Sequence, residues 1–97
     1  MVVFNKSELS AILALYGKMV ALGEWRDYAL DFGREEAVFA VFRRSSEVPL
    51  ARIVKNPKMA RKQGAFAVVS GQGMVLKRGH DLARILAFFD DRPRIVR

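Results

Sequence analysis

The chain has 97 residues, a net charge of +7, 52% hydrophobic residues and no cysteine. A chain of this length forms one domain rather than two, and its apolar fraction is too high for an intrinsically disordered protein. The lack of cysteine excludes disulfides and thiolate metal sites and favours an intracellular protein. We therefore expect a single α+β domain over residues 1–97, with an ordered core at about 4–90 and a frayed tail at 92–97.

The first predicted element is a helix at about residues 6–22. Asn5 and Glu8 have the spacing of a capping box, in which each side chain accepts a hydrogen bond from the other residue's backbone N–H. The apolar residues at helical spacing are Leu9, Ile12, Leu13, Tyr16, Met19 and Val20, widened by Ala11, Ala14 and Leu15. This width predicts a helix that is buried on more than one side. Gly23 ends the helix, because glycine adopts the left-handed conformation without cost.

A first hairpin is predicted around the glycine-containing turn at residues 33–36. In the segment at 25–32, the residues expected to face the core are Tyr28, Leu30 and Phe32, and those expected to face solvent are Asp27, Ala29 and Asp31. The segment at 37–43 is apolar on both faces, which is typical of a central strand covered on both sides. A loop at 45–47 and Pro49 precede a third strand at 50–55.

Asn56-Pro57 ends the third strand, and a basic connection follows at residues 58–63. Two further β-type segments, at 65–69 and 74–77, flank the turn at 70–73 and predict a second hairpin. Asp81 then caps a last helix with the apolar stripe Leu82, Ile85, Leu86 and Phe89. The order of elements predicts an antiparallel sheet of about five strands with an N-terminal and a C-terminal helix packed on it.

Candidate catalytic residues are few. The only histidine, His80, precedes Asp81 at the start of the last helix, which predicts helix capping rather than a Ser-His-Asp system. Asp27 and Asp31 lie four residues apart on a strand, about 13 Å, which is too far for a glycosidase pair. The turn at 71–73 has the glycines of a dinucleotide loop but lacks the helix that must follow them. We therefore expect a protein that is not an enzyme, with no cofactor and no metal site.

Basic residues carry the main functional signal. Residues 1–38 contain four Lys/Arg and six Asp/Glu, whereas residues 39–97 contain thirteen and four. The candidates for binding an anion or nucleic acid are Arg43, Arg44, Lys55, Lys58, Arg61, Lys62, Lys77 and Arg78. Phe66 lies near these residues and fits a core position as well as a stacking platform for bases.

The charge pattern leaves several partners open. It predicts nucleic acid as the leading partner, with the alternative of a protein-interaction or dimerisation module whose basic face meets an acidic protein. A phosphorylated small molecule at Lys77, Arg78 and Gly79, next to a helix N-terminus, is a third interpretation. A solvated basic surface that only keeps the protein soluble would explain the same charges.

No segment has the pattern of a membrane span or a signal peptide. The longest apolar runs, at residues 11–16 and 37–42, are far shorter than the roughly 20 residues of a membrane helix. The first residues lack a basic leader and a long apolar region. We therefore expect a cytoplasmic protein with no membrane partner. The sequence leaves homo-oligomers open.

Three segments together have a familiar pattern: GEWRDY at residues 23–28, PKMARKQG at 57–64 and LKRGHDL at 76–82, with FAVFRR at 39–44 between them. They resemble a family of small uncharacterised bacterial proteins classed as a domain of unknown function. The resemblance extends from about residue 4 to residue 89. It implies a bacterial cytoplasmic protein that stands alone as one domain, and it carries over no catalytic or binding residue.

Overall fold

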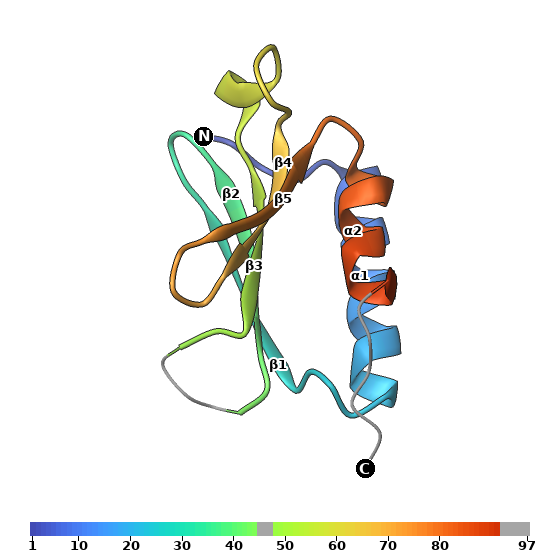
Figure 1. Cartoon of the computed structure of the whole chain (residues 1–97). Helices are drawn as coiled ribbons and strands as arrows, with labels where there is room; N and C mark the ends of the chain where they lie inside the picture. The colour runs from blue at the N-terminus through green and yellow to red at the C-terminus, as the bar shows by residue number, and fades with distance from the viewer. Residues whose placement is uncertain (45–47, 92–97) are drawn as a thin grey trace.

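The computed structural model describes residues 1–44 and 48–91, so the predicted loop at 45–47 and the predicted frayed tail at 92–97 lie outside the described residues. Helix α1 (Lys6–Ala21) and helix α2 (Leu82–Asp91) flank five strands in the chain (Figure 1). The strands are β1 (Asp27–Phe32), β2 (Ala37–Phe42), β3 (Ala51–Lys55), β4 (Phe66–Ser70) and β5 (Val75–Gly79), with a short 3-10 helix, η1 (Pro57–Met59), between β3 and β4. The predicted α+β class is confirmed.

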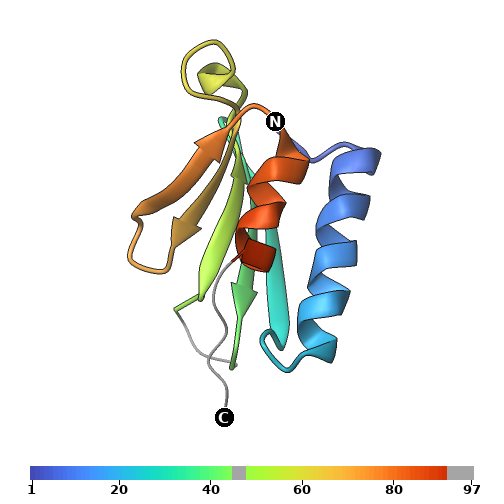
Figure 2. The same cartoon turned by 45° about the vertical axis from the view of Figure 1, so that its right-hand side comes forward.

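The five strands form one antiparallel sheet in the order β1-β2-β3-β4-β5. Both hairpins, β1–β2 and β4–β5, form where the sequence predicts them. Each strand therefore pairs with its neighbour in the chain, as short connections favour. Both helices lie on the same side of the sheet (Figures 1 and 2), which leaves the other side without a helix.

The side of the sheet away from the helices is called the open face. Alternation along each strand and the pairing register define its members, because the residues between them include Phe39, Ile53 and Val68, which pack in the core cluster with the helices. The members of the open face are Asp27, Ala29, Asp31, Val38, Ala40, Phe42, Arg52, Val54, Ala67, Val69, Val75 and Arg78. The sequence predicts β2 covered on both sides, but helices cover only one: Phe39 is fully buried under them. On the open face, Ala40 is buried at 9% exposure, and Val38 and Phe42 are half-buried.

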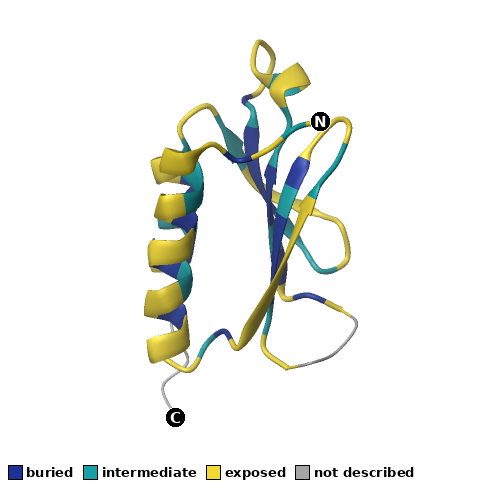
Figure 3. Ribbon diagram, turned by 180° about the vertical axis from the view of Figure 1, so that it is seen from behind, coloured by how far each residue is buried: buried dark blue, intermediate teal, exposed yellow. Residues whose placement is uncertain are grey.

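The capping box at the start of α1 forms as predicted. The Asn5 side chain accepts the backbone N–H of Glu8, and the Glu8 side chain accepts that of Asn5, both at 2.8 Å. The buried residues of α1 are Ile12, Leu15 and Met19. Burial on more than one side is wrong, since Leu13 and Val20 are 39% and 41% exposed. The helix has the sheet on one side and no further layer of described residues on its outer side (Figure 3).

Aromatic side chains fill the space between α1 and the first hairpin. Tyr28 is on the predicted helix side of β1, where its ring stacks on Phe39 at 4.8 Å between centroids, but at this edge strand it is 43% exposed and not part of the buried core. The ring of Tyr16 on α1 packs edge-on against Tyr28 at 4.9 Å. Burial raises the pKa of the Tyr16 phenol above its ordinary value, and the Asp27 carboxylate and Tyr28 add to this rise. These contacts hold the edge strand β1 beneath the helix.

Helix α2 packs on the sheet through the predicted apolar stripe. Ile85, Leu86 and Phe89 are buried, and the Asp81 side chain accepts the backbone N–H of Ala83 at 3.0 Å, as a helix cap does. Within residues 1–44 and 48–91, neither helix has the length and apolarity needed to cross a bilayer.

Two residues of α2, one on its buried face and one exposed, give a direct test of this packing. We expect Leu86→Ala to lower the free energy of unfolding by about 2–5 kcal/mol, because it removes buried contacts and leaves a cavity. Arg84 has a side chain that is 86% exposed, so we expect Arg84→Ala to change stability by only about 0.5 kcal/mol. Urea denaturation of both variants measures the difference, and equal midpoints would contradict the assigned helix face.

Candidate nucleic-acid interface

The antiparallel topology divides the eight predicted cations between the two ends of the sheet. β3 and β5 run in the same direction, so the residues at their C-terminal ends lie at one end, together with η1; we call this the η1 end. β2 runs in the opposite direction. The predicted residues at the η1 end are Lys55, Lys58, Arg61, Lys62, Lys77 and Arg78, and those at the opposite end are Arg43 and Arg44.

Lys55 is engaged inside the fold. Its ammonium group donates to the Glu8 carboxylate at 2.7 Å and to the backbone carbonyl of Val3 at 3.0 Å. The side chain is only 19% exposed, which keeps this ion pair partly shielded from solvent. Lys55 therefore ties the end of β3 to the start of α1, and it is not free to contact a phosphate.

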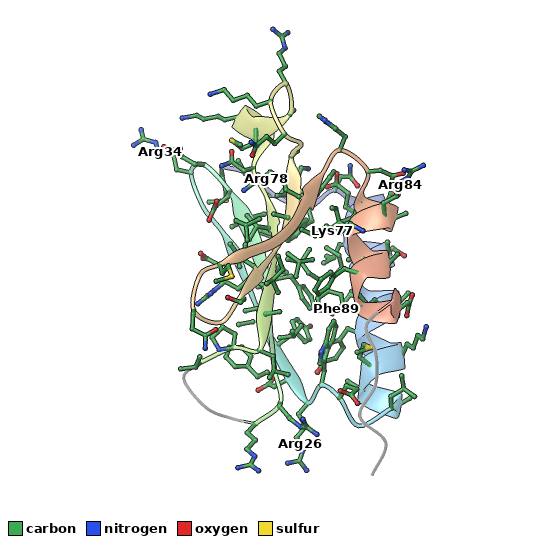
Figure 4. The ribbon with its side chains drawn as sticks, in the orientation of Figure 1. Arg26, Arg34, Lys77, Arg78, Arg84 and Phe89 are labelled. Atoms are coloured by element: carbon green, nitrogen blue, oxygen red, sulfur yellow. The ribbon has the colours of Figure 1, made fainter. Side chains whose placement is uncertain are left out.

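Lys77 and Arg78 lie next to each other on β5, so their side chains point to opposite faces of the sheet (Figure 4). Lys77 is exposed on the side of α2. Arg78 is on the open face, where one guanidinium nitrogen donates to the carbonyl of Gly64 at 3.2 Å. These two residues cannot contact the same stretch of a bound polymer from one face.

The remaining three cations come from η1 and the turn that follows it, residues 57–63, which we call the η1 loop. Asn56 caps it, since its side chain accepts the backbone N–H of Lys58 at 3.1 Å. The loop closes where Gly64 donates to the carbonyl of Met59 at 2.9 Å. It projects beyond the strand ends (Figure 1). Its exposed cations are Lys58, Arg61 and Lys62.

The first hairpin brings an additional arginine to the η1 end. Lys58 forms an ion pair at 3.2 Å with Glu35 in the β1–β2 turn, and both side chains are largely exposed. Arg34, next to Glu35, lies at the same end of the sheet (Figure 4). Sequence reasoning missed Arg34 because it lies in the acidic first part of the chain, 24 positions before Lys58. Only the pairing of the strands brings the two segments together.

A shallow hollow of about 470 Å³ lies where β5 meets α2. Its lining residues are Lys77, Arg78, Gly79, His80, Asp81, Arg84 and Ile85. The Asp81 carboxylate binds the backbone N–H of Ala83 and lies 3.9 Å from the guanidinium of Arg84. This carboxylate occupies the place at the helix N-terminus that a bound phosphate would take. The hollow is therefore a poorer anion site than Lys77 and Arg78 alone predict.

The opposite end of the sheet has its own group of arginines. A hollow of about 420 Å³ there is lined by Val20, Gly23, Trp25, Arg26, Arg43 and Arg44. All three arginines are exposed. The eight predicted cations, with Arg26 and Arg34, therefore lie at opposite ends of the sheet, and those of the η1 loop project from the fold.

Comparison with known families supports the resemblance found in the sequence. A family model described as a protein of unknown function, DUF2794, matches residues 2–86. The chain belongs to this family. No curated protein and no solved structure matches the chain. All three segments that carry the resemblance lie within the matched residues.

The match places α1, all five strands and the η1 loop within the DUF2794 region. Phe66 of this DUF2794 protein is buried in the core, so it is not a stacking platform beside the loop. Among residues 1–44 and 48–91, no three His, Asp or Glu side chains are close enough together to hold a metal ion. The η1 end presents the exposed side chains of Lys58, Arg61 and Lys62.

Proposed function

We propose that this DUF2794 protein is a nucleic-acid-binding protein of the bacterial cytoplasm, and not an enzyme. The proposal rests on the exposed cations of the η1 loop, Lys58, Arg61 and Lys62. Within the described residues, only Lys58 of these three has an ion pair, and that pair is exposed to solvent. Surface pairs of this kind are weak, so a phosphate can compete with Glu35 for the Lys58 ammonium group.

The shape of the loop favours contacts to phosphates. The Asn56 cap and the bond from Gly64 to Met59 hold the backbone in place, which lowers the entropy lost when the loop binds. The buried position of Phe66 leaves the loop without that aromatic ring for stacking on bases. Contacts to phosphates carry no sequence information, so we expect binding that depends strongly on salt and little on sequence.

A salt titration tests the proposal. We expect the wild-type protein to bind a labelled DNA duplex at low salt, at least as tightly as a labelled single strand, since a duplex has the denser phosphate charge. We expect Lys58→Glu/Arg61→Glu/Lys62→Glu to bind more weakly. Its log–log salt slope should be smaller in magnitude by about 2–3, because each lost phosphate contact removes about 0.9. Fluorescence anisotropy at several salt concentrations measures both effects.

A matched variant at the other end of the sheet distinguishes binding at the η1 loop from binding that depends only on the net charge of the protein. Arg26→Glu/Arg43→Glu/Arg44→Glu changes the total charge by the same amount and alters the second group of arginines. We expect it to bind nearly like wild type. Equal losses in both triple variants would mean that net charge alone drives binding. Undetectable binding of wild type at low salt would overturn the proposal and favour an acidic protein as the partner.

A further inference from the structure

The hollow at the end of the sheet opposite the η1 loop has a volume of about 420 Å³, and we call it the arginine hollow. Its lining residues come from the end of α1, the segment before β1 and the segment after β2: Val20, Gly23, Trp25, Arg26, Arg43 and Arg44. The backbone N–H of Arg26 donates to the carbonyl of Phe42 at 2.7 Å, which fixes Arg26 beside the end of β2. The volume is within the range of small-molecule sites, roughly 300–1,000 Å³.

The arginines of this hollow have no counter-ion among residues 1–44 and 48–91. None of the ion pairs between these residues includes Arg26, Arg43 or Arg44. Lys55 and Lys58 at the other end of the sheet are, by contrast, each paired with a glutamate. No acidic side chain is among the described lining residues of the hollow. Like charges that the fold holds together repel each other, so a bound anion would stabilise this arrangement.

We infer that the arginine hollow binds a terminal phosphate group, either of a small phosphate ester or of free inorganic phosphate. A guanidinium group is a planar fork of N–H donors that matches two phosphate oxygens at once. A terminal phosphate presents three such oxygens and a charge of about −1.5 to −2 near neutral pH. Three arginines can therefore share its oxygens and its charge. An internal phosphodiester of a nucleic acid has a single charge and continues as a chain on both sides, so it fits a concave site less well.

The apolar part of the lining favours an ester over free phosphate. Val20 is 41% exposed near the end of α1, so an alkyl group bound beside the phosphate would cover it. Trp25 is only 4% exposed, which makes its ring part of the wall and leaves no surface on which a base could stack. These two side chains favour a compact aliphatic ester over a nucleotide.

The arginine hollow is separate from the nucleic-acid site proposed above. Arg26 lies at the end of the sheet away from the η1 loop, and none of the three loop cations lines the hollow (Figure 4). The inference therefore does not rest on the proposed function. It stands or fails on the binding of small phosphates alone.

Titration followed by Trp25 fluorescence tests the inference, because Trp25 is the only tryptophan and lines the hollow. The probes are butyl phosphate, inorganic phosphate and diethyl phosphate, at about pH 8, where the first two are mainly dianions. We expect saturable binding of butyl phosphate, weaker binding of inorganic phosphate, and a Kd for the singly charged diethyl phosphate that is about tenfold higher or more. Calorimetry repeats each titration, so that binding without a fluorescence change is also detected.

Two pairs of variants locate the bound phosphate. We expect Arg26→Gln/Arg43→Gln to raise the Kd for butyl phosphate about tenfold or more, because it removes two charged donors. Arg26→Lys/Arg43→Lys keeps both charges without the forks, and we expect an intermediate Kd. Arg61→Gln/Lys62→Gln removes the same charge from the η1 loop and should leave the Kd unchanged. The substituted side chains are exposed, and circular dichroism checks that every variant folds.

The outcomes divide clearly. Inorganic phosphate binding as tightly as butyl phosphate would support the site and identify free phosphate as its ligand. No saturable binding of either compound would overturn the inference, and so would equal losses in Arg26→Gln/Arg43→Gln and Arg61→Gln/Lys62→Gln. Tighter binding of diethyl phosphate than of butyl phosphate would also overturn it, because the hollow would then prefer the phosphodiesters of a polymer.

Discussion

Gly64→Ala is expected to prevent stable folding. Gly64 has a φ of +115°, a conformation that is essentially restricted to glycine. A Cβ at this position would lie 2.1 Å from the backbone carbon and oxygen of Gly79. The obstacle is backbone of the neighbouring strand β5, which cannot rotate away as a side chain could. The cost should exceed about 4–5 kcal/mol, a large part of the roughly 5–15 kcal/mol that stabilises a domain.

Gly73→Ala is the matched control for this substitution. Gly73 also has a positive φ, +95°, but a Cβ there would have no atom within 4 Å. The control therefore isolates backbone strain, which costs about 1–3 kcal/mol. Soluble yield, circular dichroism and urea denaturation of the two variants give the comparison. If both variants lost the same stability, the close approach of Gly64 to Gly79 would not be the cause.

The second large effect is expected for Phe89→Ala. Phe89 is buried, and its ring packs edge-on against Trp25 at 5.0 Å between centroids. Removing it leaves a cavity between α2 and the segment before β1 and should lower the free energy of unfolding by about 3–5 kcal/mol. Trp25 is the only tryptophan. Its fluorescence emission should therefore shift to the red in the folded variant, because the indole loses its cover and water reaches it.

Phe88→Ala is the control, because it removes the same ring one position earlier on the same helix. Phe88 is half-buried, so we expect it to cost roughly 1–2 kcal/mol. Helix propensity changes equally in both variants, so the difference between their stabilities reports the deeper burial of Phe89 and its contact with Trp25. Thermal denaturation followed by Trp25 fluorescence provides both numbers. An unchanged emission maximum in folded Phe89→Ala would contradict the contact with Trp25.

Patterns within a few residues were enough to predict the elements. The capping box uses Asn5 and Glu8, three positions apart, and the stripe of α2 repeats within two turns. The two hairpins follow from turns of four residues each. These features depend on local backbone geometry, so they can be predicted without knowledge of distant contacts. They led to the correct fold class and to the exposed cations of the η1 loop.

Predictions about coverage failed, because they depend on where distant segments pack. The apolar pattern of residues 37–43 predicted a strand covered on both sides, but both helices lie on one face of the sheet. The same applies to Leu13 and Val20, whose apolar side chains had no second layer to meet. Hydrophobicity shows that a residue favours burial, and it does not identify the surface that will bury it.

By itself, the sequence determined the helices, the hairpins, the family and the excess of positive charge. Only the tertiary structure decided what each charge does. It paired Lys55 with Glu8 across 47 positions, turned Arg78 onto the open face, and brought Arg34 beside the η1 loop. It also brought Arg26 beside Arg43 and Arg44, through the bond from its backbone N–H to the carbonyl of Phe42. The reason is that a local pattern sets backbone conformation, whereas the environment of a side chain is set by register and packing between distant strands.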